Sequence, residues 1–416
     1  MSHSPDTRIF NSGLQPDAAG SRVPKPLRIL MLAPTPYFAD RGCHVRIYEE
    51  ARALTALGEE VRIVTYHLGR DIPGIETIRT PVVPWYRKLS AGPSWHKPYL
   101  DILLFFTALR TARRFRPDII HAHLHEGAFI GLLLKLFLAV PLIFDCQGSL
   151  TAEMIDHGFI GRGSLLYRLF AFLEKQINRR ADFIITSSGP GAEALRSDWG
   201  VGADRVLALL DGVNSTDFAP RSRAEARRAL NLPEKGSVAV FLGILNRYQG
   251  VDLLLESIRL LRDKGSRVHF LIMGFPEERY RRLAEEAGIG EMVTFTGRVD
   301  YGRASLYLCA GDIALSPKIS LTEANGKLFN YMACGLPTVV FDTPVNREIL
   351  GDAGVYAAYG DAADFAARIE ALDGDRDLRD KLSKRMTAMA AAEHSWLARG
   401  EKLRELYRGL LAGASA

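Results

Sequence analysis

The residues best suited to chemistry stand together in the stretch 320–344, which reads SLTEANGKLFNYMACGLPTVVFDTP. A polar loop with Glu323 and Asn325 leads into a short amphipathic run that starts at Lys327. The first N–H groups of a helix lack internal partners and carry the positive end of the helix dipole, so such a loop attracts anions. Lys327 could hold a diphosphate there, while Glu323 or Asn330 could hydrogen-bond ribose or sugar hydroxyls. The alternative is a capped helix with a surface lysine.

A second glycine-containing turn, FLGILNRYQGVDLL, has the pattern of a strand, a turn and a helix. While amides near Gly326 could aid in holding a diphosphate in the first loop, Gly243 permits close approach of a ligand to the backbone in this turn. Arg247 offers a cation on the same turn. Close packing of the strand on the helix is the competing explanation for Gly243.

The junction APTPYFADRGCHVRIYEEARAL follows the first apolar run and contains no G-x-G-x-x-G pattern. The pyrophosphate turn of a dinucleotide enzyme is therefore missing. Gly42 is the only glycine here, and Arg41, His44 and Arg46 could contact an acceptor or a distal phosphate. A solvated loop with basic residues explains the same pattern.

Three histidines, His121, His123 and His125, follow another apolar run in DIIHAHLHEG. Alternation places them on one side while the chain stays extended. Histidine can donate to a sugar hydroxyl or move a proton near neutral pH, although clustered histidines also suit zinc. No acid or cysteine stands at ligand spacing, so we predict no metal and expect a ligand role, or packing, for these rings. Gln147 and Glu153, after the next strand, could face the same cleft, or Glu153 could answer a helix dipole.

Short apolar runs alternate with helix-length segments in both halves of the chain, and this pattern predicts a parallel sheet in each half. The ends of these strands would position the groups described above. The expected strands are Leu27–Ala33, Val61–Thr65, Asp118–His121, Leu142–Asp145 and Phe183–Ser187, then Val238–Leu242, His269–Met273, Met292–Phe295, Ile313–Leu315 and Thr338–Phe341. The expected helices include His44–Ala56, Ser164–Arg180, Leu253–Lys264 and Glu277–Ala287. The fold class is therefore α/β, with two Rossmann-like, doubly wound domains facing a cleft.

Length and composition agree with two domains, since 416 residues exceed what one core usually holds. We expect a disordered tail at 1–25, an acceptor-side domain at 26–205, a second domain at 206–394 and a C-terminal helix at 395–416. The four cysteines are scattered without a C-x-x-C pair, which favours a reducing, cytoplasmic compartment.

No secretory signal or transmembrane segment is expected, because the most apolar stretch, Phe129–Phe144, is broken by a lysine and a proline. The excess of the +5 net charge lies in residues 1–200, which hold 24 Lys and Arg against 19 Asp and Glu. Much of it falls in Leu100–Arg116 and Gly163–Arg180, two basic amphipathic stretches. They suit either a solvated helix face or an anionic membrane surface. No nucleic-acid motif accompanies the charge, so nucleic acid is not an expected partner.

The elements DIIHAH, LDGVNSTDF, GILNRYQGVDLL, FTGRVD and KLFNYMACGLPTVV occur in this order along most of residues 27–410. Their combination resembles the group 1, or family 4, retaining glycosyltransferases of the GT-B fold. The resemblance implies that the second domain binds a nucleoside-diphosphate sugar, UDP- or GDP-linked, and that the first domain presents the acceptor. It implies no metal, because cationic residues and helix amides would stabilise the leaving diphosphate.

The resemblance also assigns particular residues. His123 matches the second histidine of the family's H-x-H element, which meets the donor sugar. Gly297, Arg298 and Val299 would lie near the base, and the helix at Ser395–Leu411 would cross back onto the first domain.

The chain departs from the family pattern at its cations. Ile244 and Gln249 occupy the places where the family commonly carries its two diphosphate cations, so Arg247 and Lys327 would have to substitute.

The family's paired glutamates fall on Thr322 and Asn330, with Glu323 one residue out of register. A variant branch with K-x-x-E-Y-M-A-x-G resembles KLFNYMACG, with Asn330 in the glutamate position. Asparagine can hydrogen-bond a ribose hydroxyl only as a neutral partner.

We therefore expect a metal-independent retaining glycosyltransferase of bacterial polysaccharide or glycolipid assembly, with a glycan, lipid-linked or small-molecule acceptor, at the inner membrane face or free in the cytoplasm. The expected catalytic residues are His123, Glu323, Arg247 and Lys327; the donor-binding residues are Gly243, Gly297, Arg298, Val299, Asn325, Gly326 and Asn330; the acceptor-side residues are Gly42, His44, Arg46 and Gln147. The alternatives are a non-catalytic protein that binds sugar nucleotides or glycans, and a sugar-nucleotide epimerase.

Overall fold

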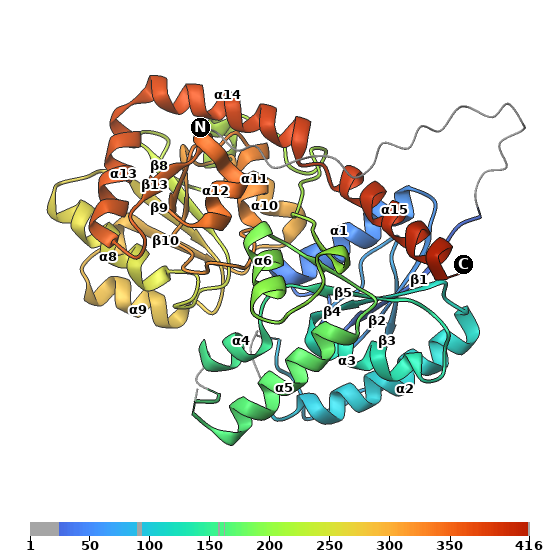
Figure 1. Ribbon diagram of the computed structural model, residues 1–416. Coiled ribbons are helices and arrows are strands. Elements are labelled where there is room, and N and C mark those ends of the chain that lie inside the picture. Colours follow the sequence, from blue (N-terminus) through green and yellow to red (C-terminus); the bar gives the residue numbers. More distant parts are fainter. Residues whose placement is uncertain (1–24, 90–93, 157–158, 162, 415–416) are drawn as a thin grey trace, which may run out of the picture.

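The computed structural model describes residues 25–414 apart from 90–93, 157–158 and 162. The expected tail at 1–25 thus lies almost entirely outside the described residues. The described chain forms two α/β domains, each built on a parallel sheet with helices packed around it (Figure 1).

The first domain contains a seven-stranded sheet in the order β3-β2-β1-β4-β5-β6-β7. Its strands are β1 (Arg28–Ala33), β2 (Glu60–Thr65), β3 (Glu76–Arg79), β4 (Ile119–His123), β5 (Leu142–Cys146), β6 (Phe183–Thr186) and β7 (Val206–Ala208). Its helices are α1 (Gly42–Ala56), α2 (Lys97–Phe115), α3 (Leu124–Lys135), α4 (Leu150–Asp156), α5 (Leu165–Arg180) and α6 (Gly189–Ser197). The central strands β4 and β5 are buried along their whole length, as expected for a parallel sheet covered on both faces.

The second domain contains a six-stranded sheet in the order β10-β9-β8-β11-β12-β13. Its strands are β8 (Val238–Leu242), β9 (His269–Met273), β10 (Val293–Gly297), β11 (Ile313–Ser316), β12 (Thr338–Phe341) and β13 (Val355–Ala357). Its helices are α7 (Arg223–Ala229), α8 (Val251–Asp263), α9 (Glu278–Glu286), α10 (Tyr301–Leu308), α11 (Lys327–Ala333), α12 (Pro344–Leu350), α13 (Ala362–Gly374) and α14 (Arg376–Glu393), and α15 (Trp396–Ala414) follows. None of the described helices is long and apolar enough to cross a membrane.

The ten strands expected from the apolar runs are all present at nearly the same residues. The sequence analysis missed β3, β7 and β13, which have three or four residues each and lie at sheet edges. Strands this short carry no readable alternation. Because β7 belongs to the first sheet, that sheet continues to Ala208, past the boundary expected after residue 205.

Helix α15 leaves the second domain and packs against α1 of the first, on the right of Figure 1. Leu403 and Tyr407 of α15 join the core cluster that contains Ile47 and Leu54 of α1. Gly400 permits the close crossing, since a Cβ there would lie 2.8 Å from the Cβ of Ala53. The expected return of the C-terminal helix is thus confirmed.

Candidate active site

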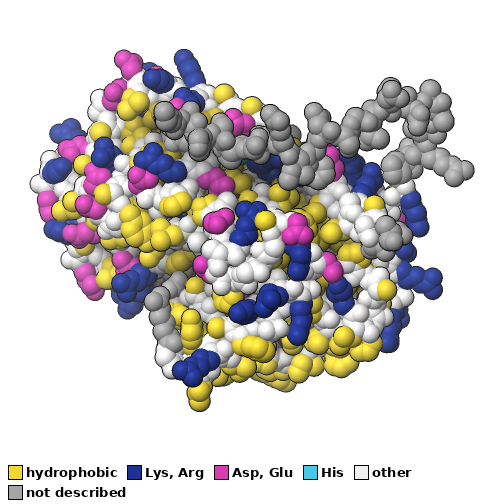
Figure 2. Space-filling model, in the orientation of Figure 1, with side chains coloured by type: hydrophobic (Ala, Val, Ile, Leu, Met, Phe, Trp, Pro, Cys, Tyr) yellow, Lys and Arg dark blue, Asp and Glu magenta, His cyan; other side chains and the backbone are white. Residues whose placement is uncertain are grey.

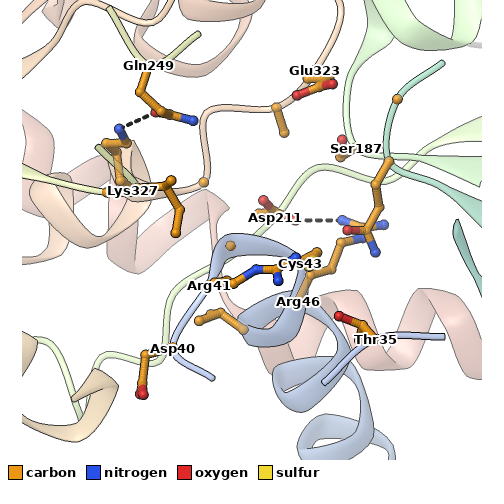
Figure 3. Close-up of a pocket in the computed structure, with 18 of the residues that line it drawn as sticks. Thr35, Asp40, Arg41, Cys43, Arg46, Ser187, Asp211, Gln249, Glu323 and Lys327 are labelled. Atoms are coloured by element: carbon orange, nitrogen blue, oxygen red, sulfur yellow. Dashed lines mark hydrogen bonds and ion pairs between the residues drawn. The ribbon is translucent and has the colours of Figure 1, made fainter. Parts of the chain in front are cut away.

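A cavity of about 620 Å³ lies between the two domains. It is lined by the loops that follow β1, β4 and β5 in the first domain and β8, β9 and β11 in the second. These are the carboxyl ends of parallel strands, where α/β sheets usually bind ligands. Figure 3 shows Lys327, Gln249 and Glu323 across the cavity from Arg46 and Arg41.

Lys327, the first residue of α11, lines the second-domain wall of this cavity. Its Nζ donates to Oε1 of Gln249 at 2.7 Å and lies 4.5 Å from the centre of the Phe241 ring. Gly243 leaves room for the amine, because a Cβ at that position would be 2.9 Å from Nζ. Burial, and to a lesser extent the ammonium of Lys318, hold the pKa of Lys327 well below its usual value. The amine is therefore poised to gain from an incoming anion.

Lys318 is a second cavity cation, which the sequence analysis missed. It follows β11 closely, and its side chain is buried. Its Nζ donates to the carbonyl oxygen of Ala324 at 2.7 Å and lies 3.4 Å from Oε2 of Glu323. A charged residue just after a buried strand end was the signal available in the sequence. Lys318 thus brings positive charge to the side of the site where Glu323 stands.

The other residues expected on the loop 320–330 have different surroundings, although all line the cavity. The amide of Asn325 is used inside the protein, by Ser316 and Asn346. Gly326 faces Asp211, whose Oδ2 would lie 2.6 Å from an added Cβ. Asn330 lines the cavity with its side chain unbonded among the described residues.

Two of the residues expected near the base are not among those that line the cavity. Arg298 donates to Oδ2 of Asp40 at 2.7 Å, and so joins the two domains instead. Gly297 ends β10 with a φ of 68° and faces the carboxylate of Glu277. Val299 does line the cavity, as does the exposed side chain of Arg247.

Arg46 is a buried structural cation rather than a free anion ligand. It lies 2.9 Å from Oδ2 of Asp145, 2.6 Å from Oδ1 of Asp211 and 3.2 Å from Oε1 of Glu50. Burial would raise the pKa of Asp145, but Arg46 and His123 outweigh it and lower that pKa. Arg46 therefore ties α1 to β5 and to the segment that connects the domains.

His123 and His44 are both fully buried, and neither is among the cavity-lining residues. Nδ1 of His123 is 2.9 Å from Oδ2 of Asp145, while Nε2 has no hydrogen-bond partner among the described residues. Nδ1 of His44 accepts from the N–H of Ala39 at 2.8 Å, and Nε2 is 2.7 Å from Oγ1 of Thr35. Both ring nitrogens of His44 are thus used to hold its own loop, which removes the expected acceptor contact.

The three histidines do not share one side of a strand. His121 and His123 stack with ring centres 4.5 Å apart, and His121 bonds to Tyr407 of α15. His125 belongs to α3, where it lines the cavity and packs edge-on against Phe144 at 4.9 Å. The chain turns into the helix at Leu124, so the extended alternation ends two residues earlier than expected.

One cluster could be read as a metal site, because ligand atoms of Glu50, His121, His123 and Asp145 lie within 4.8 Å of one another. The expectation that no acid would complete such a set was wrong, since α1 and β5 bring carboxylates that sequence spacing does not show. The guanidinium of Arg46 lies among these groups and already pairs with both carboxylates. Because the carboxylates are already paired with Arg46, we keep the absence of a metal at this cluster as a prediction.

The remaining acceptor-side residues surround a polar wall. Gly42 begins α1 with open space beside it, and Gln147 donates to Asp145 at 3.0 Å. Lys97 and Glu126 form an ion pair on the same wall. This wall therefore offers both hydrogen-bond donors and acceptors to the cavity.

Two family models match the chain. A glycosyl transferase 4-like domain matches residues 41–212, and a glycosyl transferases group 1 domain matches residues 222–389. Together the two ranges span most of the chain. The chain is made of two glycosyltransferase domains.

Curated relatives of this glycosyltransferase extend over nearly its whole length. A D-inositol 3-phosphate glycosyltransferase of Streptosporangium roseum is 28% identical over 393 residues, 89% of each chain. The sulfoquinovosyl transferase of Arabidopsis thaliana is 26% identical and is matched over 91% of this chain and 73% of its own.

Solved structures place the glycosyltransferase in the GT-B fold. Sucrose-phosphate synthase from Thermosynechococcus elongatus superposes with a TM-score of 0.79 at 21% identity, over 92% of this chain and 99% of that one. Anabaena HepE in complex with UDP-glucose superposes with a TM-score of 0.74 at 14% identity, over 92% and 100%. The expected fold of two Rossmann-like domains is thus confirmed, and the chain is a glycosyltransferase of this class.

Proposed function

We propose that this glycosyltransferase is a retaining, metal-independent enzyme that moves a sugar from a UDP- or GDP-linked donor to a glycan, lipid-linked or small-molecule acceptor. The observation that carries the proposal is the pair of lysines, Lys318 and Lys327, on one wall of the interdomain cavity. The pKa of Lys327 is lowered by burial and by its neighbour, so an anionic ligand would stabilise its ammonium form.

The proposed roles follow from the cavity geometry. Lys327, Lys318 and Arg247 neutralise the leaving diphosphate, in the manner of preorganised electrostatic stabilisation. Glu323 and Asn330 line the same wall and bind donor hydroxyls. The assignment of His123 to the region of the reacting carbon rests on the family resemblance and not on the cavity lining, since its ring is fully buried behind that lining with Nε2 unpaired in the described chain.

The donor class is supported by a structural neighbour, Anabaena HepE, which is seen with UDP-glucose. A relative named for D-inositol 3-phosphate supports a polar acceptor, and a relative named for sulfoquinovosyl transfer supports transfer of a sugar residue. We place the protein in the cytoplasm, at the inner face of the membrane, in bacterial polysaccharide or glycolipid assembly.

The test is calorimetric titration of UDP, GDP and ADP into the protein in the presence of a chelator. One diphosphate is expected to bind, and Lys327→Ala is expected to weaken that binding by at least tenfold, since a charge-assisted bond contributes about 1.5–3 kcal/mol. Lys264→Ala is the matched control, because Lys264 pairs with Glu370 on the exposed surface of the second domain.

Equal affinity in wild type and Lys327→Ala would remove the assigned role of Lys327. Binding that disappears on chelation would contradict metal independence. Absence of binding for all three diphosphates would contradict the proposed donor class.

A further inference from the structure

Helices α2, α3 and α5 form one outer face of the first domain, with α3 in contact with both others. The face continues without a break between α2 and the end of α3. The ring of Phe105 lies 5.3 Å from that of Phe106 and 6.3 Å from that of Phe137.

This face exposes an unusual number of large apolar side chains. Leu165 is 82% exposed, Leu136 76% and Phe106 60%. The exposed apolar side chains of this face are Ile102, Phe106, Phe129, Leu136, Phe137, Leu165, Leu166, Leu169 and Phe172. Together with the exposed cations of α2 and α5 given below, they form what we name the apolar–basic face. Figure 2 shows hydrophobic side chains gathered along the lower edge of the molecule, where α5 and α2 lie in Figure 1. Soluble monomers rarely expose contiguous apolar patches unless something binds there.

Basic residues accompany the apolar ones on the same helices. The exposed cations are Arg110, Arg113 and Arg114 of α2 and Arg168, Lys175, Arg179 and Arg180 of α5. Within the part of the chain that the structure describes, none of these side chains forms an ion pair.

The acids of α2 and α5 do not offset this charge. Asp101 accepts a hydrogen bond from Tyr66. Glu174 is buried and accepts from Thr151 at 2.7 Å. The exposed part of both helices is therefore positively charged as well as apolar.

The apolar–basic face adjoins the acceptor side of the cavity. Lys97, the first residue of α2, lines the cavity. Phe106 stands nine residues further along the same helix, about 14 Å away at the rise of an α-helix. A molecule held at a membrane surface under this face would therefore lie near the wall of the cavity to which Lys97 belongs.

We propose that the apolar–basic face docks on the surface of an anionic lipid bilayer. Such a surface buries leucine and phenylalanine side chains at the headgroup level and attracts the unpaired arginines. A second copy of the chain would bring like charges together across a symmetric contact, and nucleic acid would leave the apolar side chains in water. The inference deepens the membrane location given in the proposed function by naming the surface that docks, and it does not depend on the transfer reaction, because docking needs no donor.

The test is flotation of the full chain with vesicles of phosphatidylcholine, alone or mixed with phosphatidylglycerol, at low and high salt. Wild type is expected to float with the anionic vesicles at low salt and to be released by high salt. Arg113→Gln with Arg179→Gln should weaken binding by about thirtyfold, since each basic residue near an anionic surface contributes a factor of about five. Phe106→Ser with Phe172→Ser should weaken it by a similar factor, and this loss should persist at every salt concentration.

The matched control is Arg376→Gln with Leu397→Ser, which changes an exposed arginine and an exposed leucine away from α2, α3 and α5. This control should float as wild type does, and all variants should keep the thermal midpoint of wild type. Equal flotation of wild type and both face variants would overturn the proposal. So would a dimer in the absence of lipid that Phe106→Ser with Phe172→Ser dissociates, because the face would then be an interface between copies.

Discussion

At the scale of single residues, the contact between Lys327 and Gln249 determines how the proposed donor site responds to charge. The ammonium donates to a neutral amide at 2.7 Å, and burial with Lys318 lowers its pKa. In the resembling family a cation commonly stands at the place of Gln249. The neutral amide avoids a third positive charge beside two lysines.

A diphosphate bound at Lys327 should raise the pKa of that amine, because opposite charge favours the protonated form. Binding should therefore take up protons. The affinity for the diphosphate should fall as the pH rises above the pKa that the Lys327 amine has in the unliganded protein. Calorimetry of UDP or GDP, whichever binds, in buffers of different ionisation enthalpy measures this uptake. Work above about pH 7.5 keeps the phosphate ionised throughout.

Lys327→Met should abolish the proton uptake, while Lys264→Met should leave it unchanged. The same uptake in Lys327→Met and wild type would show that another group titrates on binding.

Some site residues were predictable singly and others were not. Lys327 and Gly243 stand beside strand ends in glycine-containing turns, so residue type and position sufficed. The role of His44 was not predictable, because Ala39 and Thr35 satisfy its ring only after the loop has folded. Arg46 lines the cavity, but its ion pair with Asp145 was likewise not predictable, since the two residues are 99 positions apart.

At the scale of elements, the turn between β8 and α8 carries both Arg247 and Gln249 and depends on Gly250. Gly250 precedes α8 with a φ of 73°, and a Cβ there would lie 1.8 Å from the carbonyl oxygen of Pro317. The turn is therefore pressed against the loop that follows β11, which carries Lys318. The two cation-bearing loops are held together at this point.

Gly250→Ala should destabilise the protein by about 3 kcal/mol or more, because a backbone clash adds to the left-handed strain. Gly265→Ala, at the other end of α8, is the matched control: its φ is 79° and nothing lies within 4 Å of an added Cβ. It should cost about 1–2 kcal/mol for strain alone. Denaturant unfolding compares the two, and equal losses would mean that contact with Pro317 is unimportant.

The elements themselves were largely predictable, because long apolar runs and amphipathic segments carry clear periodicity. The buried strands β4, β5 and β12 were found at nearly the residues expected. The short edge strands were not, since three or four residues fit several structures equally well. The prediction that the chain stays extended as far as His125 was wrong, because Leu124 takes a φ of 62° and begins a helix.

At the scale of the whole molecule, contacts between the domains shape the cavity. Asp40 of the first domain accepts from Arg298 and from the N–H of Tyr301, and the hydroxyl of Tyr301 donates to Glu49 at 3.0 Å. Ser188 donates to the carbonyl oxygen of Thr322 in the other domain. These pairs join residues more than a hundred positions apart, so no local pattern predicts them. The two-domain fold could be predicted, whereas the fit between the domains required the structure.

The central claim is that the protein transfers a sugar from a nucleoside-diphosphate sugar without a metal. Proton NMR of the reaction tests this claim most directly. Sugar nucleotides are incubated with wild type and a panel of glycan, inositol phosphate and lipid-linked acceptors in the presence of a chelator. We predict a glycoside with the donor's anomeric configuration, formed about a hundredfold more slowly by Lys327→Ala. Donor isomerised without an acceptor, or donor bound but never transferred across the panel, would contradict the account.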